Sequence, residues 1–129
     1  MKRVVLDASG LLSWFGPGDG RNRLRTEYEQ GLLTVVAHRQ LTESVLATLA
    51  ASGTWERDRL MRVASELDRL DFELHEPPIA EVAGWIARGL TADQARAAAL
   101  ASSMDLALVT ADPDVLSRAG TIARSVVEA

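Results

Sequence analysis

Two short apolar runs constrain the fold of this 129-residue chain, because an aspartate follows the end of each one. Residues 4–6 lead directly into Asp7, and residues 106–109 come shortly before Asp112. Short apolar runs of this kind are typical of buried strands in a parallel sheet. In open α/β sheets, ligands bind beyond the carboxyl ends of the strands. We therefore expect both aspartates at one edge of a parallel sheet, where they face a common site.

Strand and helix patterns alternate along the chain. The expected strands are residues 3–6, 33–36, 72–74, 106–109 and 122–127, and the expected helices cover or pass through residues 7–15, 21–30, 41–49, 55–70, 82–86, 92–103 and 113–119. A glycine- and proline-rich break is expected at residues 16–20. This alternation predicts an α/β fold, a three-layer α/β/α sandwich with a central parallel sheet, built by a single domain over residues 1–129.

Composition excludes several kinds of chemistry. The chain has no cysteine and only two histidines, which argues against thiolate sites, histidine-rich zinc sites and a histidine-based triad. Its formal net charge of −4 gives no long-range attraction to nucleic acid. Any contact with phosphates must therefore be local, through a metal or through arginines. Arg21, Arg23 and Arg25 are candidates, although we favour a solvated helical face as their role.

No part of the sequence resembles a membrane or export signal. The apolar stretch near the start is too short for a signal peptide, and no run approaches the ~20 residues of a membrane span. We therefore expect a cytoplasmic protein with no membrane partner.

Each of the two strand-end aspartates has a structural explanation of its own. Asp7 can cap the helix that starts after it, because its side chain can accept a hydrogen bond from an amide of the first helical turn. Asp112 precedes Pro113, the typical order of a cap followed by proline at the first helical position. Neither aspartate alone indicates a function.

Two further acidic residues also have ordinary explanations. Glu43 falls at the edge of the apolar stripe of its helix, neither buried nor fully outside, and can pair with Arg39 four residues earlier. The stretch from Thr91 to Gln94 matches a capping box, in which Asp93 is favourably placed near the positive end of the helix dipole.

The combination of these acids points to a metal site. Residues Asp7, Glu43, Asp93 and Asp112 can all converge on one edge of the expected sheet. Carboxylates gathered there repel one another unless a cation or hydrogen-bond donors hold them together. A bound divalent metal is the simplest explanation.

The order and spacing of these motifs resemble a known family over nearly the whole chain. The motifs are residues 4–9 (VVLDAS), 41–49 (LTESVLATL), 89–95 (GLTADQA) and 108–112 (LVTAD). With them the chain resembles a PIN domain, and more narrowly the VapC-type ribonuclease toxins of bacterial toxin–antitoxin pairs.

The resemblance implies an endoribonuclease that hydrolyses RNA phosphodiester bonds with Mg²⁺ or Mn²⁺. Asp7, Glu43, Asp93 and Asp112 would be catalytic. Among them Asp7, Asp93 and Asp112 would bind the metal, and Glu43 would orient or deprotonate the attacking water. The resemblance also implies an antitoxin partner and a homodimer.

The chain departs from the family at the third acid. The family usually carries this acid eighteen residues before the final aspartate, and here that position is Gln94. Asp93 lies one residue earlier, which on a helix turns the side chain by ~100°. Asp93 could replace the missing acid, Gln94 could contribute its carbonyl oxygen, or nuclease activity could be lost. We favour the first two over loss, because hard cations accept carboxylate and amide oxygens.

Other classes of protein place acids at strand ends as well. A protein-binding module with the same fold would dock an antitoxin peptide or pair with itself without cleaving RNA, and Gln94 favours this alternative. Both hypotheses predict an apolar groove. A phosphoacceptor receiver domain would need a lysine after a late strand, and Lys2 is the only lysine. A haloacid-dehalogenase-like phosphatase would need a second aspartate where Ser9 stands.

Overall fold

The computed structural model describes residues 2–15, 22–53 and 55–127, and these form a five-stranded, all-parallel sheet in the order β3-β2-β1-β4-β5. The strands are β1 (Lys2–Leu6), β2 (Leu33–His38), β3 (Glu73–His75), β4 (Ala107–Thr110) and β5 (Ala123–Ser125). The predicted parallel sheet is confirmed. The expected break at residues 16–20 and the candidate Arg21 lie outside the described residues.

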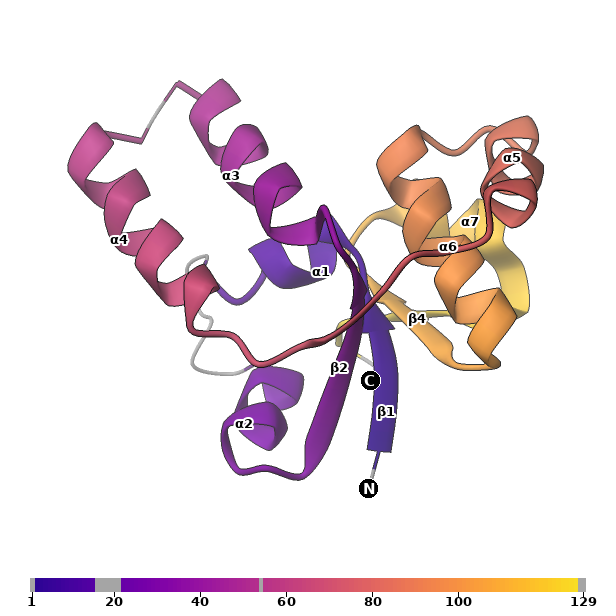
Figure 1. Ribbon diagram of the computed structural model, residues 1–129, viewed down its shortest axis with the longest axis horizontal. Helices are drawn as coiled ribbons and strands as arrows, with labels where there is room; N and C mark the ends of the chain where they lie inside the picture. Colours follow the sequence, from indigo (N-terminus) through magenta and orange to yellow (C-terminus); the bar gives the residue numbers. More distant parts are fainter. Residues whose placement is uncertain (1, 16–21, 54, 128–129) are drawn as a thin grey trace.

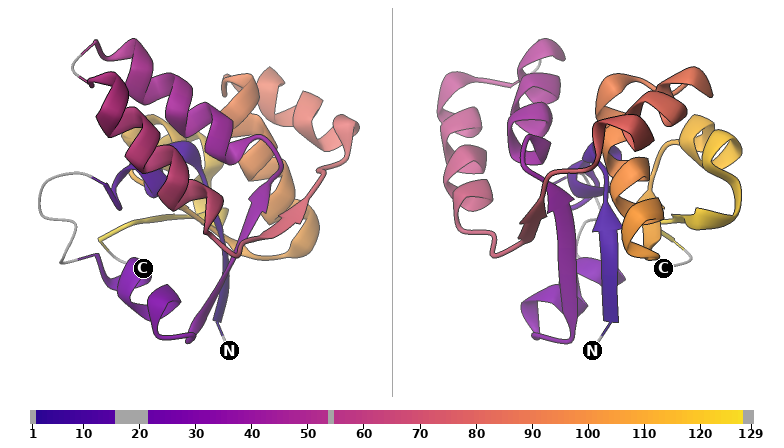
Figure 2. Two further views of the ribbon diagram at one scale, coloured as in Figure 1. Left: turned by 60° about the vertical axis from the view of Figure 1, so that its left-hand side comes forward. Right: turned by 45° about the vertical axis from the view of Figure 1, so that its right-hand side comes forward.

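Helices cover both faces of this sheet. They are α1 (Ala8–Leu12), α2 (Arg23–Glu29), α3 (Leu41–Ala51), α4 (Arg57–Asp68), α5 (Ile79–Ala87), α6 (Ala92–Met104) and α7 (Pro113–Ala119). Figure 1 shows α3 and α4 to one side of β1 and β2, and α5, α6 and α7 to the other side. The two views of Figure 2 show the same separation, with β1 and β2 side by side. The predicted α/β/α sandwich is therefore confirmed.

Side-chain alternation along the strands explains the two helical layers. On β1, Val4 and Leu6 are buried in the core that contains α1, α3 and α4, whereas Val5 is buried against α5 and α6. Successive residues of a strand point to opposite faces, so an uninterrupted apolar strand needs cover on both sides. The alanines of α6, buried from Ala97 to Ala101, let this helix approach the sheet closely. Among the described residues, no helix has the length and apolar character needed to cross a membrane.

Several expected boundaries differ from the structure at their ends. The first helix stops at Leu12, although the apolar pattern extends to Phe15. The hydroxyl of Ser13 donates a hydrogen bond to the carbonyl oxygen of Gly10 at this end. The last strand covers only Ala123–Ser125, because Ile122 belongs to a 3-10 turn and residues 126–127 form a turn at the other end. Tertiary contacts and local hydrogen bonds set such ends, which periodicity alone does not specify.

We expect Gly10→Ala to destabilise the protein by about 1 to 3 kcal/mol, because there is no room for a side chain at this position. A Cβ atom on Gly10 would lie 2.7 Å from Leu6 Cδ1 and 2.9 Å from the Val109 carbonyl oxygen. The measurement is the free energy of unfolding in urea. The matched control is Gly84→Ala in α5, where a Cβ meets nothing within 4 Å and should add about 0.5 to 1 kcal/mol of stability. Equal unfolding midpoints for both variants would contradict the close packing of α1 on the sheet.

Candidate functional site

The chain reverses its direction of winding beside β1. The sheet grows from β1 to β2 and β3 on one side, and the chain then crosses back to place β4 on the other side of β1. Such a switch point leaves a crevice at the carboxyl ends of the two strands. Asp7 directly follows β1, and Asp112 follows β4 by two residues. The structure therefore places these two aspartates at one edge of the sheet, as expected.

Asp7 is a buried carboxylate held by three hydrogen-bond donors. Its side chain is the N-cap of α1, where Oδ1 accepts a hydrogen bond from the Gly10 backbone N–H at 2.8 Å. The Ser9 hydroxyl donates to the same oxygen at 2.8 Å, and the Thr110 hydroxyl donates to Oδ2 at 2.6 Å. Only 3% of Asp7 is exposed to solvent. The capping role considered for Asp7 is thus confirmed, and it does not exclude a further role.

Ser9 and Thr110 form a hydroxyl network around Asp7 that sequence analysis missed. Thr110 Oγ1 also accepts a hydrogen bond from the Asp112 backbone N–H at 3.1 Å, and Ser9 Oγ accepts one from the Ala111 N–H at 2.9 Å. These contacts connect the end of β1 with the end of β4. The available signal was a hydroxyl residue two positions from each strand-end aspartate.

Burial raises the pKa of the Asp7 carboxyl above its usual range. Hydrogen bonds from Thr110, Gly10 and Ser9 lower this pKa again in part, and the negative charge of Asp112 raises it further. Asp112 is therefore close enough to interact electrostatically with Asp7. A cation bound between them would relieve both the burial penalty and the repulsion.

Gln94 connects Asp112 to the start of α6. Its Oε1 accepts a hydrogen bond from the Thr91 backbone N–H at 3.0 Å, so the predicted capping box is present. Its Nε2 donates to Asp112 Oδ2 at 3.0 Å. Asp112 Oδ1 in turn accepts from the Asp114 N–H at 2.8 Å and caps α7. In this arrangement the carbonyl oxygen of Gln94 serves the helix cap, and its amide N–H faces the acid.

Asp93 faces a different set of partners. Its Oδ1 lies 3.3 Å from Arg96 Nη1 and 3.8 Å from Nε2 of His38. His38 is buried at the end of β2, and burial lowers the pKa of its imidazole despite the opposing charge of Asp93. This histidine was not predicted to take part in the site, because a lone buried histidine gives no signal in the sequence.

Glu43 lies on the outer side of α3. It is exposed, whereas the expectation placed it at the edge of the apolar stripe. At about 100° per residue, Glu43 is turned about 160° around the helix from the buried Val45. Thr48, not Glu43, is the residue through which α3 borders the acidic pocket. No ion pair joins Glu43 to Arg39 among the described residues.

The three aspartates Asp7, Asp93 and Asp112 border a pocket of about 230 Å³, which we call the acidic pocket. It is lined by Asp7, Ala8, Ser9, Leu12, Thr48, Thr91, Asp93, Gln94 and Asp112. Carboxylate oxygens are the ligands that Mg²⁺ prefers, so the donor chemistry fits a hard divalent cation. Within the described part of the chain, no three acidic or histidine side chains gather closely enough to form a complete metal site. The structure thus brings Asp7 and Asp112 together and places Asp93 in the lining of the same pocket, where it pairs with Arg96.

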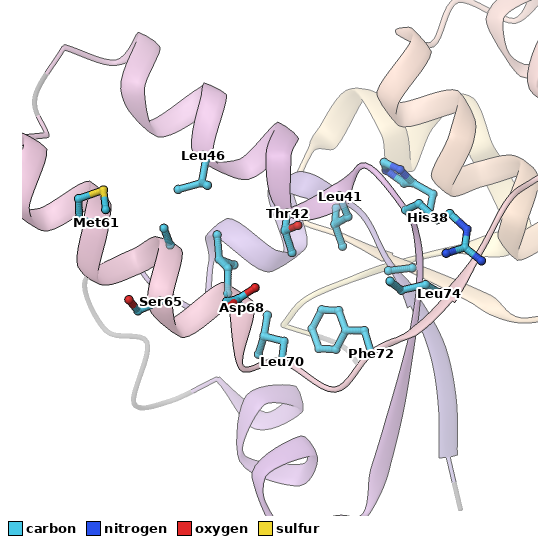
Figure 3. A pocket seen from close by; sticks show the side chains of 14 residues that line it. His38, Leu41, Thr42, Leu46, Met61, Ser65, Asp68, Leu70, Phe72 and Leu74 are labelled. Atoms are coloured by element: carbon cyan, nitrogen blue, oxygen red, sulfur yellow. The ribbon is translucent and has the colours of Figure 1, made fainter.

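A larger apolar groove lies between α3, α4 and the segment that leads into β3, with a volume of about 510 Å³. Figure 3 shows Leu46 of α3 and Met61 of α4 on its opposite walls, and Phe72 and Leu74 on the wall formed by the β3 segment. Met61 and Leu74 are 57% and 46% exposed. Apolar side chains exposed in a groove are typical of a surface that binds a partner. The predicted apolar groove is therefore present.

Comparison with known proteins identifies similar structures. No protein-family model and no curated protein sequence matches the chain. The protein PAE2754 from Pyrobaculum aerophilum is similar in structure, with a TM-score of 0.64 and 22% sequence identity, and the match covers 98% of this chain and 90% of that one. FitAB bound to an IR36 DNA fragment also has a TM-score of 0.64, with 12% identity and coverage of 95% and 94%. Both likenesses support the α/β sandwich as a PIN-like fold.

We expect Asp7→Asn to stabilise the protein at pH 7 by about 1 kcal/mol, or ~4 °C in Tm. The asparagine oxygen can still cap α1, and no charge has to be buried. Because the Asp7 pKa is raised in the folded state, the folded chain binds more protons than the unfolded chain between the unfolded and folded pKa values. The stability of the parent therefore falls as the pH rises from the unfolded pKa through the folded one. The advantage of asparagine should therefore disappear below about pH 4.

Thermal unfolding between about pH 4 and 8 measures this difference. The control is Asp71→Asn, which replaces an exposed carboxylate outside the pocket. A variant that is less stable than the parent at neutral pH would show that the three hydrogen bonds to Asp7 outweigh the cost of its burial.

Proposed function

We propose that this protein is a metal-dependent endoribonuclease, related to VapC-type toxins, which hydrolyses RNA phosphodiester bonds at the acidic pocket. The observation that carries this proposal is the pair of carboxylates, Asp7 and Asp112, at the switch point of a PIN-like sheet. A buried acid with a raised pKa next to a second acid costs stability, and such groups cluster at functional sites. A bound cation would offset this cost. The resemblance of the four sequence motifs supports the same activity.

Asp7 and Asp112 would hold Mg²⁺ or Mn²⁺, and Asp93, which lines the same pocket, would complete the set of ligands. When bound, such an ion lowers the pKa of a water molecule and offsets the charge that develops on the phosphate. Ser9 and Thr110 would keep the Asp7 carboxylate in a fixed orientation, through the hydrogen bonds described above. Arg96 contacts Oδ1 of Asp93 and would compete with the cation for this oxygen.

The proposed role of Glu43 as the group that orients or deprotonates the attacking water remains a prediction. Its position outside the lining of the acidic pocket means that it would have to act on a substrate that extends beyond the pocket. An exposed acid on α3 can do so only when the RNA brings the scissile phosphate toward that helix. Glu43→Gln therefore belongs in the activity assay below.

A second candidate function is a protein-binding module, and the apolar groove favours it. An antitoxin peptide with apolar side chains would bury Met61, Leu74 and their neighbours. His38 lines this groove and also lies 3.8 Å from Asp93, so an occupant of the groove would contact a neighbour of the acidic pocket. A homodimer is proposed as well, supported by the apolar side chains exposed on α5, Ile79 and Ile86.

The purified protein is expected to cleave mixed RNA in Mg²⁺ or Mn²⁺ and to be inactive with a chelator. Asp7→Asn should lower the rate at least about 100-fold, because it removes a charged ligand. Asp93→Asn, Gln94→Ala and Glu43→Gln test the remaining site residues in the same assay. Glu81→Gln on the outer face of α5 is the control and should leave the rate unchanged.

If metal gives no cleavage above the Asp7→Asn background, the nuclease proposal is wrong and the binding module takes its place. Full activity of Asp93→Asn would remove Asp93 from the ligand set and leave the rest of the proposal standing.

We expect Gln94→Glu to bind Mn²⁺ about tenfold more tightly than the parent, because the number of charged ligands sets the affinity of such sites. Glutamate can keep the capping box with Thr91, while its second oxygen faces Asp112 in place of the amide N–H. Titration of free Mn²⁺ by electron paramagnetic resonance measures the affinity. Gln94→Met is the control, since it removes the N–H donor without adding charge. An unchanged affinity in the glutamate variant would contradict a cation site at this position.

A further inference from the structure

A further hollow, of about 250 Å³, is lined mainly by arginine and aromatic side chains. We call it the arginine–aromatic surface and define it by Phe15, Arg25, Trp55, Arg59, Arg62 and Glu66. Its three arginines outnumber its one glutamate, although the whole chain has a net charge of −4. The surface is therefore a local exception to the overall charge, and it is suited to an anionic ligand.

Two arginines of this surface, Arg59 and Arg62, lack a close acidic partner in the part of the chain that the structure describes. The Arg59 guanidinium lies 4.4 Å from the centre of the Trp55 ring, and Arg62 is exposed on the same helix. Among the described residues, neither of them forms an ion pair. A guanidinium stacked on an aromatic ring still offers its N–H donors to a phosphate. Trp55 is half-buried and lines the hollow.

A buried donor without an acceptor lies next to this surface. Trp14 is 2% exposed, and within the described residues its Nε1–H has no hydrogen-bond partner. Trp14 lines an adjoining hollow of about 150 Å³ together with Arg25, Arg69, Glu29 and Glu66. Most buried donors in folded proteins are paired, so this N–H is an exception beside the arginine–aromatic surface.

The arginine–aromatic surface begins one helical turn from the acidic pocket. Leu12 of α1 lines the acidic pocket, and the Phe15 backbone N–H donates to the Leu12 carbonyl oxygen at 3.0 Å. Phe15 itself lines the arginine-rich hollow. The two hollows therefore lie on either side of one short stretch of chain, residues 12–15.

We propose that the arginine–aromatic surface binds single-stranded RNA, with phosphates on Arg59 and Arg62 and a base stacked on Trp55. This inference rests on the proposed nuclease function and extends it by assigning a substrate-binding surface outside the acidic pocket. Single-stranded nucleic acid matches the chemistry, because it presents regularly spaced phosphates together with bases that stack on aromatic rings and guanidinium planes. An acidic peptide matches the charge but supplies no such stacking partner.

The test measures binding without cleavage. Fluorescence anisotropy with a labelled single-stranded RNA of about 12 nucleotides, in chelator and at about 50 to 200 mM salt, gives the affinity and its salt dependence. The double variant Arg59→Ala and Arg62→Ala should bind about tenfold more weakly, and its slope of log affinity against log salt should be smaller by about 1.4. Arg57→Ala is the matched control, because Arg57 is exposed on α4 but lines neither hollow.

Trp55→Leu should weaken binding about tenfold without changing the salt slope, and Trp55→Phe should restore most of the affinity. Urea unfolding of each variant separates lost binding from lost folding. Equal binding by the double variant and Arg57→Ala would overturn the proposal. Tighter binding of a glutamate-rich peptide than of RNA would also overturn it, by assigning the surface to an acidic protein.

The outcome for nuclease activity is independent of this result. A parent that binds RNA through these arginines but never cleaves it would refute the nuclease and keep the binding surface. If the double variant binds and cleaves RNA as well as the parent does, the nuclease proposal stands and the proposed binding surface is refuted.

Discussion

The carboxylate of Asp7 accepts hydrogen bonds from α1 and from the end of β4, so a single side chain connects two neighbouring strands at the switch point of the sheet. This contact places a carboxyl group at a position that is 3% exposed, where burial raises its pKa. Close packing of Gly10 on Leu6 and Val109 keeps water away from the same place. The position of α1, and with it the acidic pocket, depends on satisfying this buried acid.

Gln94 shows how the molecule compensates for a second acid nearby. In the structure its amide N–H faces Asp112, where the family that the chain resembles would place a further carboxylate. A neutral donor stabilises the acid pair without a metal, whereas a third acid would add repulsion and raise cation affinity. A donor at position 94 therefore favours the stability of the protein without a metal, whereas an acid there favours tighter metal binding.

Much of the fold was predictable because the sequence signals were local. The parallel sheet was predicted from uninterrupted apolar strands that alternate with helical patterns. The start of α6 was predicted from the Thr91 capping box. Element ends were less predictable. The last strand is shortened at one end by the 3-10 turn at Gly120–Ile122 and at the other by a turn at residues 126–127, and the first helix ends before the apolar pattern does. Both ends are set by hydrogen bonds and contacts that a periodic pattern does not contain.

The pattern of apolar strands was enough to place Asp7 and Asp112 at one edge of the sheet, because parallel strands align their carboxyl ends there. The pairing of β1 with β4, and the groups that surround the two aspartates, follow from the three-dimensional packing. Glu43 lies on the exposed side of its helix. Asp93 lies close to Arg96 and His38. The hydroxyls of Ser9 and Thr110 donate hydrogen bonds to Asp7. A side chain's direction depends on how its helix packs and which partners lie within hydrogen-bond reach, and residues distant in sequence supply those partners.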